Sequence, residues 1–276
     1  MSIPCPVCAD PLQQRSDWLL FCQNCGLYRS NLEPGPGKAF DGIETLRRQN
    51  FEQILDHVEQ TMPVKGRRLL EIGSAKGWFL QAAQQRGASV TGVEPVSADA
   101  AAARLAGFDI EEGLFPQSPQ DRGPYDLIVF NDVFEHLPDP IAAVKACADL
   151  LTPDGLLIIN IPSSRGPIFR VASLLQVIGV SGPYDRLWQR GLPSPHITYF
   201  NPDNLRQLVE GQTDLRRSIS HPLPSLHRDG LRQRIESSAN GMPSGLVFAA
   251  AWALSFVLPL FPSDIELSVY SRATLP

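Results

Sequence analysis

The stretch RLLEIGSAKGWFLQAAQQRGASVTGVEP (68–95) contains an apolar run, a glycine loop, a helical segment and a second apolar run. The apolar runs predict strands over 68–72 and 90–93, and the segment between them predicts a helix over 78–86 that ends at Gly87. The same alternation continues, with strands expected over 108–110, 125–130 and 156–161 and helices over 98–106 and 141–151. This pattern predicts an α/β fold, in which helices cover both faces of a doubly wound, mostly parallel sheet.

The loops after the first two expected strands are the candidate ligand-binding loops, because ligands of such sheets bind beyond the carboxyl ends of the strands. In the first loop, Gly73 and Gly77 allow a sharp turn and a close approach of the backbone to a ligand. The second strand ends at Glu94 and Pro95. A carboxylate at that position can accept hydrogen bonds from both hydroxyls of a ribose.

The glycine loop also distinguishes between two kinds of cofactor. A nicotinamide dinucleotide requires the pattern G-x-G-x-x-G, and the three positions here are Gly73, Ala75 and Trp78. A tryptophan at the third position blocks the close approach of helix and strand. The spacing is better suited to a nucleoside that carries no pyrophosphate.

Five stretches in this order and spacing resemble the class I S-adenosylmethionine-dependent methyltransferases. They are LLEIGSAKG (69–77), VTGVEP (90–95), GPYDLIVFNDVFEHLPDP (123–140), LLTPDGLLIINIPS (150–163) and PHITYFNPDNLRQLVE (195–210). The best match is the subgroup of small-molecule methyltransferases with the motif E-H-L-x-D-P. Ala75 departs from the family, which usually has a glycine there.

The resemblance implies a Rossmann-like sheet of seven strands, whose last two strands, expected near 215–220 and 265–272, are antiparallel. It implies S-adenosylmethionine as cofactor. Glu71 and the loop Gly73–Ser74–Gly77 would hold the methionine end, while Glu94 and Pro95 would hold the ribose. Gly113, Leu114 and Phe115 would border the adenine, and Asn131 and Asp132 would line the floor near the sulfonium. For Leu114 and Phe115, ordinary core packing is the alternative.

Methyl transfer needs a general base only if the acceptor must lose a proton. His136, in the E-H-L-x-D-P motif, and His196 are the candidate bases, and Tyr199 is a weaker candidate. The alternative for each histidine is a structural role in its own loop.

Four cysteines stand at the front of the chain, in the pairs C-P-V-C (5–8) and C-Q-N-C (22–25). Cys5, Cys8, Cys22 and Cys25 have the spacing of a tetrahedral Zn²⁺ site, which predicts a small structural zinc ribbon. Redox-active pairs and free thiols are the alternatives. Cys147 lies in an expected helix and is predicted to be a buried apolar residue.

The expected domains are the zinc ribbon at 1–30, a linker and helix at 31–66, with the helix over 38–60, and the methyltransferase domain at 67–276. Insertions at 162–195 and 222–263 are expected to cover the substrate. In the first insertion, Tyr184, Trp188 and Arg190 either contact substrate or pack at the surface. The second contains seventeen residues without a charge (245–261), which predict a buried or pocket-covering helix or a peripheral membrane contact.

The net charge of -5 and the pI near 5.6 argue against a general nucleic-acid binder. No secretory signal is apparent, so a cytoplasmic protein is expected, with contact to the inner membrane surface as an option. The expected function is methyl transfer from S-adenosylmethionine to a small-molecule, sugar or lipid-linked acceptor, in cell-surface polysaccharide or secondary-metabolite biosynthesis. The alternative is a non-catalytic scaffold that docks partners through its zinc ribbon. The sequence leaves the acceptor and the oligomeric state open.

Overall fold

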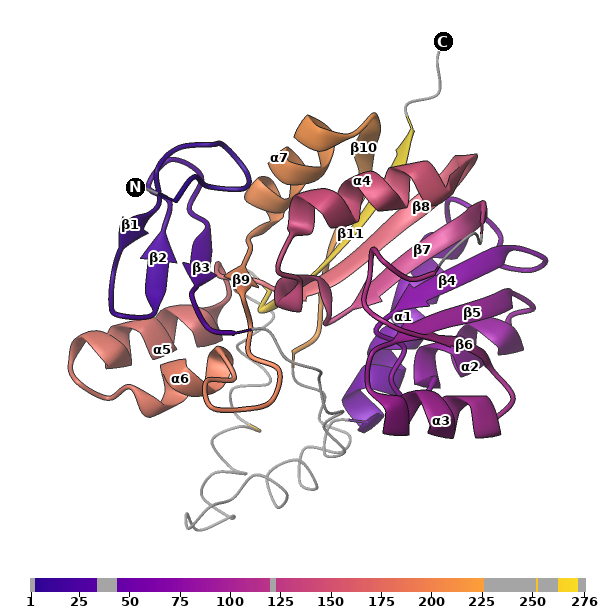
Figure 1. The fold of residues 1–276 in the computed structure, drawn as a ribbon, viewed down its shortest axis with the longest axis horizontal. Coiled ribbons are helices and arrows are strands. Elements are labelled where there is room, and N and C mark those ends of the chain that lie inside the picture. Colours follow the sequence, from indigo (N-terminus) through magenta and orange to yellow (C-terminus); the bar gives the residue numbers. More distant parts are fainter. Residues whose placement is uncertain (1–2, 34–43, 120–122, 226–251, 253–262, 273–276) are drawn as a thin grey trace.

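A twisted sheet of seven strands lies at the centre of the computed structural model, which describes residues 3–33, 44–119, 123–225, 252 and 263–272 (Figure 1). In spatial order the strands are β10 (Leu215–Leu223), β11 (Ile265–Arg272), β8 (Leu151–Pro162), β7 (Tyr125–Asn131), β4 (Arg68–Ile72), β5 (Ser89–Glu94) and β6 (Asp109–Glu112). The pairs from β6 to β8 are parallel, whereas β11 is antiparallel to both of its neighbours. The predicted doubly wound sheet is confirmed, with its strand order reversing beside β4.

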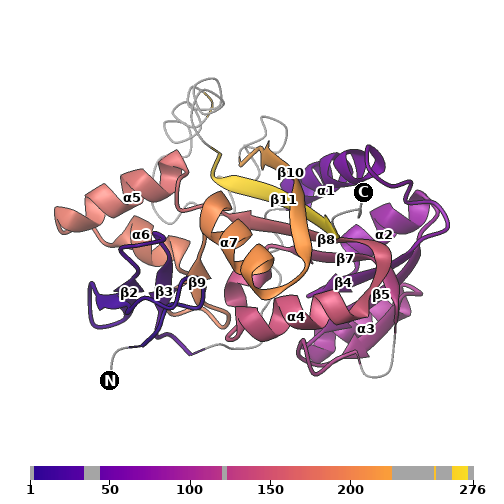
Figure 2. The same ribbon diagram turned by 90° about the horizontal axis from the view of Figure 1, so that it is seen from above.

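Helices cover both faces of this sheet (Figure 2). The helices α1 (Glu44–Glu59), α2 (Trp78–Gln85) and α3 (Ser97–Leu105) share one apolar cluster, and α4 (Pro140–Leu150) and α7 (Pro202–Gln212) share another. Side chains of β7 alternate between the two clusters, since Leu127 and Val129 belong to the first and Ile128 and Phe130 to the second. A strand buried on both faces therefore reads as a continuous apolar run.

The first expected insertion folds into α5 (Pro167–Val177) and α6 (Gly182–Leu187). Most of the second insertion, including residues 245–261 apart from 252, falls outside the described residues, and so does the start of the helix expected over 38–60. Within the described part of the chain, no helix has the length and apolarity needed to cross a bilayer.

The cysteine-containing segment at the front forms a second sheet with a strand from much later in the chain. In the described residues this sheet has the order β1 (Gln13–Gln14), β2 (Leu19–Phe21), β3 (Tyr28–Ser30) and β9 (Thr198–Tyr199). Tyr28 pairs with Tyr199 in an antiparallel register. The pairing of β3 with β9 was not foreseen, and it joins the front of the chain to the loop that carries His196.

An aromatic cluster reinforces this junction. Trp18 meets Trp188 edge-on, with ring centroids 5.5 Å apart, and also contacts Tyr184. Trp188 and Tyr184 are almost completely buried, and the Arg190 guanidinium lies 5.3 Å from the centroid of the Trp18 ring. For these three residues of the first insertion, the packing alternative is the one that the structure supports.

Candidate active site

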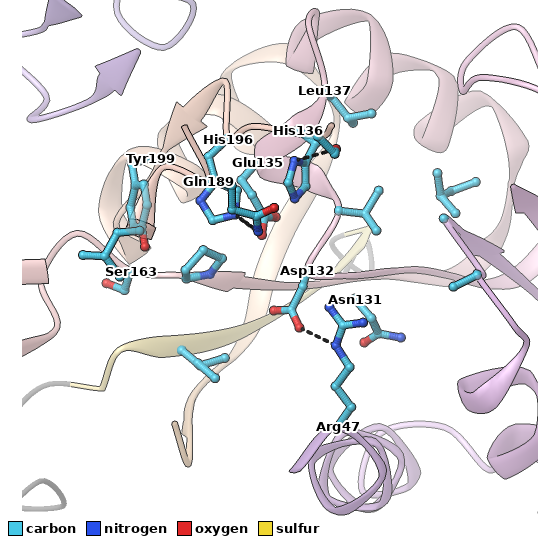
Figure 3. A pocket seen from close by; sticks show the side chains of 18 of the residues that line it. Arg47, Asn131, Asp132, Glu135, His136, Leu137, Ser163, Gln189, His196 and Tyr199 are labelled. Carbon is cyan, nitrogen blue, oxygen red and sulfur yellow. Dashed lines mark hydrogen bonds and ion pairs between the residues drawn. The ribbon is translucent and has the colours of Figure 1, made fainter. Parts of the chain in front are cut away.

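A cavity of about 1690 Å³ opens at the carboxyl ends of the parallel strands. Its walls come from the loops after β4 to β8, from α1 and from the inserted helices α5 and α6 (Figure 3). The predicted site residues that line it are Gly73, Glu94, Pro95, Gly113, Leu114, Phe115, Asn131, Asp132, His136, His196 and Tyr199. Since single ligands usually occupy about 300–1000 Å³, this cavity has room for two.

The glycine loop after β4 is shaped by close contacts. Gly73 has φ of +72°, and a Cβ atom there would lie 2.5 Å from a methyl carbon of Val133. Gly77 has φ of +80°, and a Cβ there would lie 2.7 Å from the ring of Phe108. Both positions therefore require glycine. Ala75 also has a positive φ, of 44°, which explains why a glycine is the usual residue at this position.

Trp78 does not fill the cavity. It is the first residue of α2 and packs, half-buried, with the apolar cluster beneath that helix, where the Arg48 guanidinium lies 5.5 Å from its ring. The crevice beside the glycine loop is thus free of the indole.

Glu94, at the end of β5, is fixed by the backbone. One carboxylate oxygen accepts a hydrogen bond from the Ala75 amide (2.7 Å) and the other from the Val96 amide (2.9 Å). Each oxygen retains acceptor capacity, because a carboxylate offers about four lone-pair directions. The side chain is 5% exposed and borders the cavity, so it could still accept from a diol.

Glu71 and Asn131 form a buried pair at the ends of β4 and β7. The Asn131 amide donates to Glu71 Oε1 at 2.9 Å, whereas Glu71 Oε2 and Asn131 Oδ1 have no hydrogen-bond partner among the described residues. Burial raises the pKa of Glu71 to about 8. Asn131 lines the cavity and Glu71 does not. Two unpartnered buried oxygens are suited to a cationic donor such as an amino-acid ammonium.

Three other predicted cofactor residues differ in their surroundings. Leu114 is 64% exposed at the rim of the cavity, where it can pack against a planar base. Phe115 is buried edge-on against Phe130, so core packing is at least part of its role. Ser74 is buried and, like Gly77, is not a lining residue.

Asp132 has a partner that the sequence did not reveal. Its carboxylate lies 3.6 Å from Nε of Arg47, which reaches the cavity from α1 (Figure 3). Burial raises the pKa of Asp132, and the nearby Arg47 guanidinium offsets only part of that rise. Nothing in the periodicity of the expected helix distinguished Arg47 from the other charged residues on it.

Both predicted histidines lie in one cluster on the opposite wall, with ring centroids 4.7 Å apart. His136 Nδ1 is 3.0 Å from the Pro195 carbonyl, and His196 Nε2 is 3.0 Å from the Gln189 amide nitrogen. Burial lowers the pKa of His136 to about 4 and also lowers the pKa of His196, so both rings are neutral at pH 7. Tyr199 adjoins His196, with centroids 5.5 Å apart, and burial raises its pKa.

Glu135 is a further member of this cluster, which sequence reasoning passed over. Its carboxylate is 1% exposed and lies 3.9 Å from His196 Nε2. Glu135 stands next to His136 in the same motif, and that adjacency was the available signal. Gln189 gave no signal, because it contacts His196 only through the tertiary fold.

The segment around His196 is held between two neighbours. The Ile197 amide donates to the Glu135 carbonyl at 2.9 Å, and the Ile197 carbonyl accepts from the Ser30 amide at 2.8 Å. The Ser30 hydroxyl donates to the His196 carbonyl at 2.8 Å. The strand β3 therefore fixes the backbone of a wall of the cavity.

The four N-terminal cysteines converge. Their sulfur atoms lie within 4.8 Å of one another, with Cys5 and Cys25 3.5 Å apart and Cys8 and Cys22 3.4 Å apart. Sulfurs bound to one tetrahedral Zn²⁺ at 2.3 Å are about 3.8 Å apart. Gly26, with φ of +73°, completes the second turn. The donor set and its spacing fit zinc.

Comparisons with known proteins agree with this geometry. Residues 46–212, more than half of the chain, match the family described as "Methyltransferase domain". Over 190 residues the chain is 29% identical to a ubiquinone biosynthesis O-methyltransferase of Marinobacter nauticus, covering 64% of this chain and 77% of that protein. A Xylella fastidiosa protein of the same name is 31% identical over 136 residues, covering 46% of this chain and 51% of its own length.

Solved structures with this fold include a putative sarcosine dimethylglycine methyltransferase from Galdieria sulphuraria. It has a TM-score of 0.55 and 17% identity, and covers 82% of this chain and 86% of its own. Magnesium protoporphyrin IX methyltransferase from Synechocystis, solved with bound S-adenosylhomocysteine, has a TM-score of 0.55 and 12% identity, with 87% and 90% covered. At these sequence identities, the similarity to the two structures shows that the fold is shared and carries no information on the substrate.

Proposed function

Because the chain belongs to the methyltransferase domain family and is an S-adenosylmethionine-dependent methyltransferase, we propose that it methylates an oxygen atom of a small-molecule acceptor. The observation that carries the proposal is the cavity, which is bordered on one side by Glu94 and the glycine loop and on the other by the histidine cluster. The relatives named O-methyltransferases support oxygen as the accepting atom.

S-adenosylmethionine, when bound, supplies a methyl group that is already activated by the sulfonium. The task of the protein is then alignment of acceptor and methyl group, the proximity term of catalysis. Glu94 would accept from the ribose hydroxyls, while Asn131, held by Glu71, would receive the methionine end. Leu114 would cover the adenine.

The direct test of the proposal is calorimetric titration with S-adenosylmethionine, followed by transfer of a radiolabelled methyl group into cell extract. Binding in the micromolar range and a labelled product are expected. Absence of binding at millimolar cofactor would instead support the scaffold alternative.

The acceptor is expected to carry an apolar portion. The inserted helix α5 contributes Ile168, Phe169, Val171, Ala172 and Leu175 to the wall. Of the acceptors expected from the sequence, in cell-surface polysaccharide or secondary-metabolite biosynthesis, an apolar wall favours a lipid-linked intermediate over a free sugar. Peripheral membrane contact through residues 245–261 stays a prediction from the sequence.

Either histidine would act as the base that removes the acceptor proton. General-base catalysis contributes about 10²–10⁴-fold, so His196→Ala or His136→Ala should lower kcat by that factor while leaving cofactor affinity unchanged. His57→Ala, on α1, is the matched control and should retain turnover. Full turnover in both His136→Ala and His196→Ala would exclude them as bases.

Glu71 should make cofactor binding depend on pH. In the free protein its pKa of about 8 keeps it mostly protonated at pH 7. A cationic ammonium beside Asn131 favours the carboxylate form, so binding should release protons at pH 7, and affinity should rise from pH 7 to about 8, above which deprotonation of the ammonium itself opposes the rise. Calorimetry in buffers of different ionisation enthalpy measures that release. Glu71→Gln should abolish it; an unchanged release in this variant would assign it to another group.

We further propose that Cys5, Cys8, Cys22 and Cys25 hold a structural Zn²⁺. Four sulfurs close the coordination sphere, so the ion would stabilise the fold and not act on substrate. Metal analysis of the purified protein should find at least one zinc per chain, which a chelator removes only as the front of the chain unfolds.

A further inference from the structure

The histidine cluster also has the composition of a metal site. Glu135, His136 and His196 each offer one ligand atom, and these atoms lie within 4.8 Å of one another. Glu135 and His136 come from the short helix η2 (Phe134–His136), and His196 precedes β9, sixty residues later. Figure 3 shows the three side chains gathered on one wall of the cavity.

Two atoms of this cluster lack partners although they are buried. Glu135 Oε2 and His196 Nδ1 have no hydrogen-bond partner among the described residues. An unpaired polar atom in the interior is unfavourable, and a buried carboxylate calls for a cation or a proton. The nearby guanidinium of Arg47 pairs with Asp132.

The surroundings of His136 also favour the tautomer that a metal ligand needs. Its Nδ1 lies 3.0 Å from the Pro195 carbonyl, to which it can donate only when that nitrogen carries the proton. Nε2 then presents its lone pair. Metal-bound histidines characteristically donate their other ring nitrogen to a carbonyl in this way. At ligand distances of about 2.1 Å, donor atoms are at most about 4.2 Å apart, so shifts below about 1 Å would close the site.

We propose that Glu135, His136 and His196 bind a divalent transition-metal cation in the wall of the cavity, separately from the four-cysteine site. Two imidazoles and one carboxylate are suited to Zn²⁺, Mn²⁺, Fe²⁺ or Co²⁺ and leave coordination positions open. Since all three residues line the cavity, those positions face the space available to a ligand. Under the proposed function, the cation would bind an acceptor oxygen there and lower the pKa of its hydroxyl. A histidine whose free nitrogen binds the cation cannot also act as the base, so with the cation bound the loss of turnover in His136→Ala or His196→Ala would reflect loss of a ligand.

The test is a metal titration of the full-length protein after its cysteine site has been saturated with Zn²⁺. Wild-type protein should bind one further equivalent of Zn²⁺, and Co²⁺ in its place should give a visible spectrum without sulfur-to-cobalt bands. Removing a group that only hydrogen-bonds to a metal ligand lowers metal affinity by about 10–100-fold. Because Glu135 would itself be a ligand, Glu135→Gln should lower the affinity for the further Zn²⁺ by at least about 100-fold. Neither readout depends on methyl transfer.

Variants must be shown to be folded by their unchanged affinity for S-adenosylhomocysteine. His196→Asn serves as the second variant if Glu135→Gln fails that criterion. His57→Ala, which alters a histidine on α1, should retain the further equivalent. Two outcomes would overturn the site. One is equal uptake of the cation by wild-type protein and by the folded Glu135→Gln variant. The other is no uptake by wild-type protein at 1 mM Zn²⁺ or Mn²⁺, which is about a thousandfold above a micromolar Kd. Neither outcome would affect the proposed methyl transfer.

Discussion

Replacing Glu94 with alanine is expected to weaken binding of S-adenosylhomocysteine by more than about 100-fold. The Glu94 carboxylate is held by the Ala75 and Val96 amides and borders the cavity at the end of β5. Hydrogen bonds to a charged group contribute about 1.5–3 kcal/mol each, so two hydroxyls amount to about 3 kcal/mol or more. Since 1.4 kcal/mol corresponds to a factor of ten, calorimetry should detect the loss easily.

Two further variants separate recognition from folding. Glu94→Gln keeps an acceptor for the backbone and should show a smaller loss. Asp109→Asn makes the same change of charge at the amino end of the neighbouring strand β6 and should bind as tightly as wild type. Tight binding by a folded Glu94→Ala protein would contradict the assignment of the ribose site.

Cys22→Ser is expected to slow methyl transfer by about 100-fold while leaving cofactor binding intact. Cys22 is fully buried in the cysteine cluster, and the strand β3 that follows it holds the backbone at His196 and Ile197. Loosening that strand would displace the histidine wall, and a misplacement of about 1 Å can cost about 100-fold in rate. Zinc content and turnover should fall together, and the affinity for S-adenosylhomocysteine should change less than about twofold, because separated sites with no shared partners couple by less than about 0.5 kcal/mol.

Cys147→Ala is the control for this experiment. Cys147 is buried in α4, as the sequence predicted, and does not belong to the cysteine cluster. It should retain zinc and turnover. Wild-type turnover in a zinc-free Cys22→Ser protein would show that the front of the chain does not support the cavity.

The sheet was predictable because its signals are local. Apolar runs located β4, β5, β7 and β8, and the helices between them begin and end within a few residues of the expected positions. Parallel strands buried on both faces give unbroken apolar runs, which are easily recognised. The positions of Glu94 and the glycine loop then followed from where such sheets bind ligands.

The wall opposite the cofactor loops was only partly predictable. His136 and His196 were candidates by residue type, but Glu135, Gln189 and Arg47 became candidates only once their contacts were known. Each of these contacts joins segments that the sequence spacing does not relate. Tyr184 and Trp188 are a similar case, because the sequence left substrate contact and packing open and the structure packs both side chains against Trp18.

The sequence by itself determined the fold class, the place of Glu94 and the glycine loop at the carboxyl ends of neighbouring strands, and the four-cysteine cluster, since each depends on local patterns in the chain. Only the tertiary structure decided that β3 pairs with β9 and thereby brings the cysteine segment against the loop of His196. The pairing consists of two residue pairs, Tyr28 with Tyr199 and Arg29 with Thr198. So short a pairing between distant segments leaves no periodic pattern in either of them. It forms because the aromatic side chains of both segments bury one another, and that complementarity exists only in the folded chain.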